Sequence, residues 1–205
     1  MKKIVFGLLT TLSVIAYSCS NNASSKPAAE QTPAAQTPAA HEDTTEVKVV
    51  KASFTNVDAG VAAYMKNLTE GYLQIKNALI AGKAADAGDA AKNMSAAMKG
   101  FDKSLLSADQ KKVYDQNEED LKEHAEHITK STGDIEHQRE HFSMMSEDMS
   151  SLVKAFGGGK TLYNDHCPMA KNGKGANWLS ETKEIKNPYF GEKMIECGEV
   201  EEKIQ

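Results

Sequence analysis

The residues of this chain whose types are best suited to chemistry lie near its C-terminus. They are two cysteines, two methionines and a histidine: Cys167, Cys197, Met169, Met194 and His166. Thiolate and thioether sulfur atoms are soft ligands that favour copper(I) over calcium or magnesium, and zinc makes little use of methionine. We therefore predict a copper(I) site formed by the cysteines, with the methionines as supporting ligands and His166 as an optional nitrogen donor. Zinc is the alternative metal.

The same two cysteines could instead form a disulfide. Pro168 disfavours a helical conformation at Cys167, and an extended segment would point the side chains of Cys167 and Met169 in the same direction. Neither observation separates a metal site from a covalent bond. In the alternative interpretation the domain is a non-catalytic structural or protein-interaction module, and the disulfide between Cys167 and Cys197 is its staple.

Two pairs of histidines form a second candidate metal site. They are His124 and His127, three residues apart, and His137 and His141, four residues apart. Each spacing places both rings on one face of a helix. Because the pairs flank one turn, an antiparallel hairpin would bring His127 level with His137 and His124 level with His141. Four imidazoles could then bind zinc, copper or nickel, although a solvated polar face among many acidic residues is the simpler alternative.

Apolar residues recur at three- and four-residue steps over about residues 57–156, which predicts four helices. We expect them over about 57–79, 84–105, 107–128 and 134–156. Ser107 and Gln110 have the spacing of a capping box at the start of the third helix. Short connections favour an antiparallel, up-down four-helix bundle.

Glycines and a proline interrupt the pattern after residue 160, so we expect turns and one short helix there. Trp178, Ile185 and Tyr189 are of the kind that would dock this segment on the helices. The predicted fold is therefore all-α, a four-helix bundle carrying an irregular C-terminal extension. No phosphate-binding glycine loop or complete hydrolase motif is present in the sequence, which favours a protein that is not an enzyme.

The N-terminus has the pattern of a secretory signal, in which two lysines precede an apolar run that ends in small residues before Cys19. We expect a signal peptide over residues 1–18 and lipidation of Cys19, which would anchor the protein to a membrane in the cell envelope, facing the periplasm. Residues 19–52 are rich in Ala, Pro and Thr and are expected to form a disordered tether. Residues 53–205 would then form the domain. A formal net charge of −5 argues against nucleic acid as a partner.

Several segments also support a resemblance to a known family. The runs "TLYNDHCPMA", "GANWLS", "IKNPYFG" and "MIECGEV", together with "EHQREHFSMMSEDMSSLVKAFG" upstream, resemble an uncharacterised domain-of-unknown-function family of Bacteroidetes-type bacteria. The resemblance covers roughly residues 57–200. That family occurs in small lipoproteins and behind the periplasmic adaptor subunits of heavy-metal efflux systems. The resemblance therefore implies a role in metal handling or efflux, with an efflux component as a partner.

Overall fold

A computed structural model describes residues 47–205 of the chain. The predicted signal peptide, Cys19 and most of the predicted tether lie outside the described residues. Between residues 47 and 205, no helix is long and apolar enough to cross a membrane.

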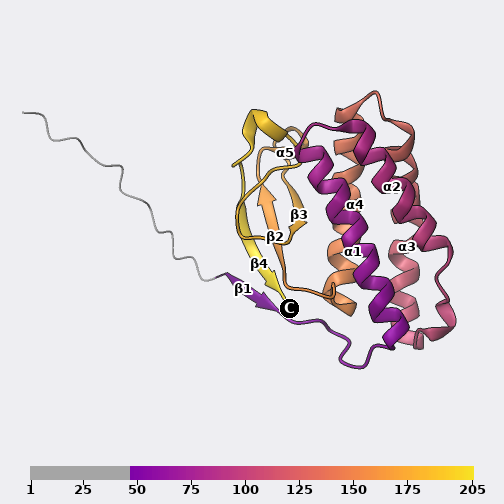
Figure 1. The fold of residues 1–205 in the computed structure, drawn as a ribbon. Coiled ribbons are helices and arrows are strands. Elements are labelled where there is room, and N and C mark those ends of the chain that lie inside the picture. The colour runs from indigo at the N-terminus through magenta and orange to yellow at the C-terminus, as the bar shows by residue number, and fades with distance from the viewer. Residues whose placement is uncertain (1–46) are drawn as a thin grey trace, which may run out of the picture. The chain divides into compact units, whose positions relative to one another are not determined.

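Four long helices make up most of the described chain (Figure 1). They are α1 (Ala59–Ile80), α2 (Ala84–Lys99), α3 (Ala108–Lys130) and α4 (Ile135–Phe156). Each helix packs against the next one along the chain, and α1 also packs against α4. The prediction of four helices is confirmed, with the largest difference at the end of the second. That helix ends at Lys99, and the predicted continuation to Leu105 is wrong because residues 103–105 form a separate 3-10 turn.

Local hydrogen bonds explain where α3 and α4 begin. The Ser107 hydroxyl accepts from the backbone N–H of Gln110 at 3.3 Å, and the Gln110 side chain accepts from the Ser107 backbone N–H at 3.0 Å. This reciprocal pair is the predicted capping box, and it satisfies donors that a helix start otherwise leaves free. At α4, the Asp134 carboxylate accepts from the backbone N–H of His137 at 3.1 Å.

The predicted stripes of the first, third and fourth helices form the core between the helices. Gln138 is the polar member, and its side-chain amide donates to the carbonyls of Ala84 and Ile128 at 2.9 Å each. In α2 the buried residues depart from the predicted stripe. Ala97 continues the three- and four-residue steps but is exposed, and the neighbouring Met98 is buried instead. The buried members of the confirmed stripes are Val61, Tyr64, Leu68, Tyr72, Ile75, Leu79, Tyr114, Leu121, Ile128, Gln138, Phe142, Met145, Met149, Leu152 and Phe156.

The prediction of an all-α fold is wrong, because three strands of the C-terminal region and residues 48–50 form a four-stranded sheet. Its strands are β1 (Lys48–Val50), β2 (Leu162–Cys167), β3 (Ala176–Ser180) and β4 (Glu199–Ile204), in the order β1-β4-β2-β3. β2 is antiparallel to both of its neighbours, and β1 runs parallel to β4. β1 falls inside the stretch predicted as a tether, so the folded domain extends into that stretch.

Two buried polar residues explain why β2 does not have the sequence pattern of a strand. Its register against β4 shifts between Asn164 and Asp165, and both of these polar residues are buried. The extra residue at this shift is Glu201 of β4, because Asn164 pairs with Glu202 and Asp165 pairs with Val200. Strand prediction depends on alternating apolar residues, which Asn164 and Asp165 do not provide.

Hydrogen bonds from Tyr72 join the sheet to the helices. The Tyr72 hydroxyl lies 2.7 Å from the hydroxyl of Ser146 on α4 and accepts from the backbone N–H of Leu179 on β3 at 3.0 Å. Trp178 and Tyr189 are buried beside this contact with their rings edge to face, in agreement with the docking role predicted for them. The C-terminal segment is therefore part of the same core as the helices.

Candidate metal centre

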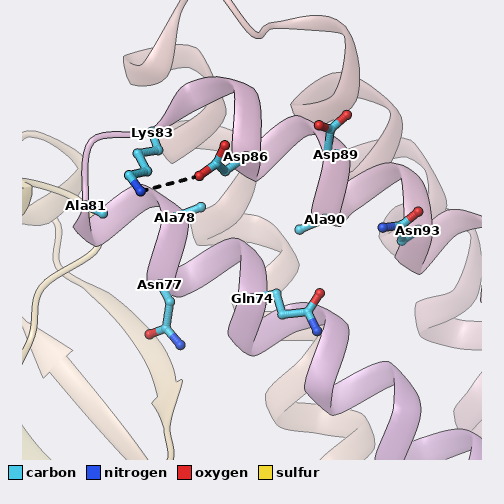
Figure 2. A pocket seen from close by; sticks show the side chains of 9 residues that line it. All are labelled: Gln74, Asn77, Ala78, Ala81, Lys83, Asp86, Asp89, Ala90 and Asn93. Atoms are coloured by element: carbon cyan, nitrogen blue, oxygen red, sulfur yellow. Dashed lines mark ion pairs between the residues drawn. The ribbon is translucent and has the colours of Figure 1, made fainter.

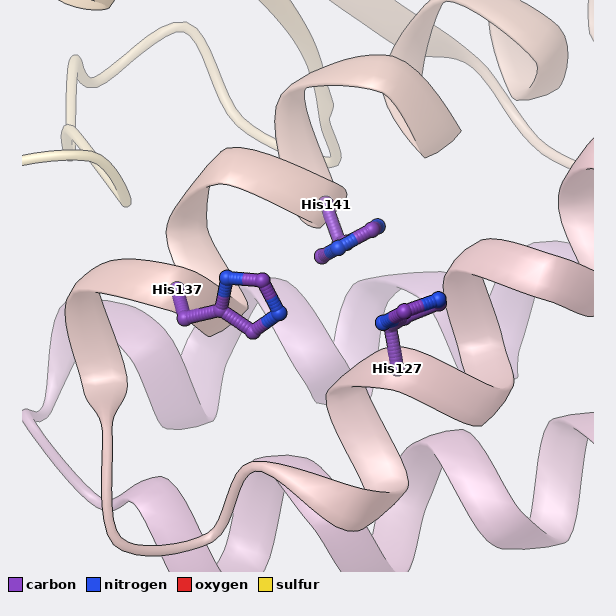
Figure 3. Close-up of side chains that lie close together, drawn as sticks. All are labelled: His127, His137 and His141. Carbon is purple, nitrogen blue, oxygen red and sulfur yellow. The ribbon is translucent and has the colours of Figure 1, made fainter.

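Three histidine side chains face one another between α3 and α4 (Figure 3). His127 comes from α3, and His137 and His141 come from α4. One ring nitrogen from each of the three residues lies within 4.8 Å of the other two. The four-residue spacing of His137 and His141 and the short turn between the helices produce this arrangement, because both act over short distances in the sequence.

The three rings already lie close to the separation that a metal ion requires. Zinc binds imidazole nitrogen at about 2.0–2.1 Å, so two ligands of a tetrahedral ion lie about 3.4 Å apart. The rings of His127 and His141 are stacked with their centroids 4.1 Å apart, and the rings of His137 and His141 meet edge to face at 4.6 Å. Small side-chain rotations would therefore convert the cluster into a three-nitrogen site.

His124 belongs to the same cluster but has a different position. Its Nδ1 atom lies 3.2 Å from Nδ1 of His141, which is a hydrogen-bonding distance. His124 is not one of the three residues whose nitrogen atoms converge. The four predicted histidines are therefore brought together. Nitrogen atoms of three of them converge, and the fourth, His124, lies within hydrogen-bonding distance of His141.

The electrostatics of the cluster keep His141 neutral. Burial, together with the neighbouring rings of His127, His137 and His124, lowers the pKa of His141 to about 4. A neutral imidazole has the free electron pair that metal binding requires. The side chains of His127 and His137 are 46% and 38% exposed, so an ion can reach the cluster from solvent.

Asp148, on α4, is a neighbour of the cluster that the sequence analysis did not select. Its Oδ2 atom is buried without a hydrogen-bond partner and lies 3.9 Å from Nε2 of His124. Burial, together with the nearby carboxylates of Asp120 and Glu147, raises the pKa of Asp148 to about 7. The signal in the sequence is its position two helical turns after His141, which places both residues on one face of α4.

The two cysteines also lie together. Cys167 is buried at the end of β2, Cys197 is half-buried, and their sulfur atoms are 2.7 Å apart. A hydrogen bond with Cys167 and, to a smaller extent, burial raise the pKa of the Cys197 thiol to about 11. The structure therefore places the pair within reach of either a disulfide or a shared metal ion, although a raised thiol pKa works against the thiolate form that a metal needs.

The other three predicted ligands of the C-terminal site are less well placed. His166 precedes Cys167 in β2, so the two side chains point to opposite faces of the sheet. Its Nδ1 atom lies 3.6 Å from a carboxylate oxygen of Glu201. Met169 is 53% exposed, and Met194 is partly buried on a 3-10 turn that ends three residues before Cys197.

A surface groove also lies between α1 and α2 (Figure 2). Its volume is about 500 Å³, and it is lined by alanine and polar side chains. Lys83 and Asp86 form an ion pair across 3.7 Å at one end of it. The groove contains neither histidine nor cysteine, so it adds no ligand to the two candidate sites.

Comparison with known proteins places part of the chain in a family context. Residues 68–161 match a family described as "Protein of unknown function (DUF3347)". No curated protein matches the chain, and no solved structure does. The matched region begins within α1 and ends just before β2. It therefore contains all four histidines of the cluster and excludes Cys167 and Cys197.

Proposed function

We propose that this domain binds a divalent transition-metal ion, zinc(II) or copper(II), through His127, His137 and His141. The observation that carries the proposal is the convergence of one nitrogen atom from each residue within 4.8 Å. Three protein ligands are enough for a zinc site that keeps its fourth position for water or an exchangeable ligand. That coordination suits a protein that binds a metal ion and passes it on.

The type of ligand limits the kind of ion. Imidazole nitrogen suits zinc, copper and nickel, whereas calcium and magnesium prefer oxygen. The low pKa of His141 also favours the binding of such an ion, because a ligand that is already neutral loses no proton when the ion binds. The proposed role is binding and delivery, without catalysis.

Titration of the metal-free full chain with zinc chloride, in competition with a chromogenic chelator, tests the proposal. We expect one zinc ion per chain. His127→Gln and His137→Gln should each weaken binding strongly, and their partly exposed positions make loss of folding a minor concern. His166→Gln is the matched control, since it removes a histidine outside the cluster. Equal affinity in all four proteins would refute the site.

A second candidate is the copper(I) site at Cys167 and Cys197, with Met169 and Met194 as supporting ligands. The sulfur separation of 2.7 Å favours it over any arrangement in which the cysteines act apart. His166 is left out of this version because its side chain faces away from Cys167. Under reducing conditions, replacement of both cysteines by serine should abolish tight copper(I) binding. Retained binding would leave the disulfide staple as the role of the pair.

We further propose that the protein is a lipoprotein of the cell envelope that takes part in metal handling or efflux. The support is the secretory-signal pattern that ends just before Cys19 and the resemblance of the chain to domains fused to efflux adaptors. Cys19 would carry the membrane anchor, and an efflux component would be the partner. Metabolic labelling with a fatty-acid analogue tests the anchor: wild type should be labelled and Cys19→Ala should not. Equal labelling would refute lipidation at this residue.

A further inference from the structure

Three side chains form a chain of polar contacts that leads away from the proposed metal site. The Nδ1 atom of His141 lies 3.2 Å from Nδ1 of His124, and Nε2 of His124 lies 3.9 Å from Oδ2 of Asp148. Both ring nitrogens of His124 are therefore directed at named partners. For His141, the contact with His124 occupies Nδ1 and leaves Nε2 free.

The protonation of the two rings follows from this order of contacts. A hydrogen bond between two ring nitrogens needs one donor and one acceptor, and a neutral imidazole carries one proton. A modest rotation that closes the 3.9 Å gap would let the Asp148 carboxylate accept a hydrogen bond from Nε2 of His124, which favours the tautomer with the proton on Nε2. Nδ1 of His124 is then the acceptor. Nδ1 of His141 must be the donor, and Nε2 of His141 carries the free electron pair.

We propose that Asp148 and His124 are positioning residues that hold His141 in the tautomer whose Nε2 atom binds the metal. The inference rests on the proposed function of His127, His137 and His141 as ligands. It assigns His124 to the support of a ligand, whereas the sequence analysis expects His124 to bind the ion itself. Metal-binding histidines commonly donate their second ring N–H to such an outer partner, which fixes the ring and its tautomer.

The surroundings of Asp148 support this role. Its Oδ2 atom is buried and has no hydrogen-bond partner, which is costly for an oxygen that carries negative charge. A modest rotation that closes the 3.9 Å gap to His124 would provide one. The other charged groups that act on Asp148 are Asp120 on α3 and Glu147 on α4. Both are acidic, so His124 is the donor available to it within this group.

Nitrogen-15 NMR of the histidine rings in the metal-free full chain at pH 8 tests the inference directly. Each ring nitrogen has a chemical shift that depends on whether it carries a proton. We expect the proton of His124 on Nε2 and that of His141 on Nδ1. Asp148→Leu removes the acceptor at similar size, so both rings should become mixtures of tautomers. A proton on Nε2 of His141 in the wild type would overturn the inference.

Zinc affinity provides the second readout. Loss of an outer partner of a metal ligand typically weakens binding by about 10- to 100-fold. We expect a loss in that range for Asp148→Leu and recovery of binding in Asp148→Glu, which restores the carboxylate. Glu147→Gln is the control, because it removes a neighbouring charge whose side chain is 66% exposed. An equal loss in Glu147→Gln and Asp148→Leu would overturn the positioning role.

These two measurements separate this inference from the proposed function. If the wild type binds neither zinc(II) nor copper(II), the proposed function fails, and the tautomers are still measured because they need no metal. If the wild type binds zinc while His141 carries its proton on Nε2, the proposed function stands and the inference fails.

Discussion

Oxidation of Cys167 and Cys197 should stabilise the domain by an amount that can be worked out from their separation. The sulfur atoms lie 2.7 Å apart, inside van der Waals contact, and the residues are 30 positions apart in the sequence. Closing a loop of that length lowers the entropy of the unfolded chain and contributes about 3.5 kcal/mol at 25 °C. With a urea dependence of about 2 kcal/mol per molar, the unfolding midpoint should rise by about 1.5–2 M.

Urea unfolding of the oxidised and reduced protein measures this difference. Trp178 is the only tryptophan and is buried against the same sheet, so its fluorescence reports the transition. The variant in which both cysteines are replaced by serine is the control, and its midpoint should not respond to reductant. Peptide mapping should link the Cys167 and Cys197 peptides in the oxidised sample. A linked protein with an unchanged midpoint would refute the stability argument, and an absent link would refute the proximity.

Three further substitutions test the packing beside the sheet and a buried charge within it. Gly198→Ala should destabilise the domain by more than about 2 kcal/mol, because φ is +145° and the new Cβ would lie 2.7 Å from a Trp178 ring carbon. Gly173→Ala, at φ +82° with no atom within 4 Å, should cost less in the same thermal unfolding assay, and equal costs would refute the steric argument. Asp165 is fully buried, and burial raises its pKa to about 7 from 3.8, so the folded state keeps a proton that the unfolded state releases. The free energy of unfolding should therefore fall as the pH rises from about 4 to about 7. Asp165→Asn should reduce that slope, and the variant should be more stable than the wild type at pH 8 by on the order of 3 kcal/mol.

The histidine cluster could be predicted from the sequence because every step is local. The spacing of His137 and His141 places both rings on one helix face, and the turn at residues 131–134 is short enough to bring His127 opposite them. The distinction between three ligands and one supporting residue could not be predicted. It depends on ring orientations and on Asp148, which in the sequence is one acidic residue among many.

The sheet could not be predicted because its strands are short and irregular. β2 buries two consecutive polar residues, Asn164 and Asp165, which a pattern of alternating apolar residues would not include, and its register against β4 shifts between them. β1 has three residues and pairs with β4 at the other end of the chain. Pairing over such a distance leaves no local signal, whereas the helices are predictable from their own periodicity.

X-ray absorption spectroscopy of the zinc-loaded full chain tests the central claim most directly, because it identifies the atoms bound to the metal. Ligation by His127, His137 and His141 predicts a first shell of nitrogen or oxygen atoms at about 2.0–2.1 Å, with the outer-shell scattering of imidazole rings. Sulfur at about 2.3 Å would contradict the account and would move the zinc to Cys167 and Cys197.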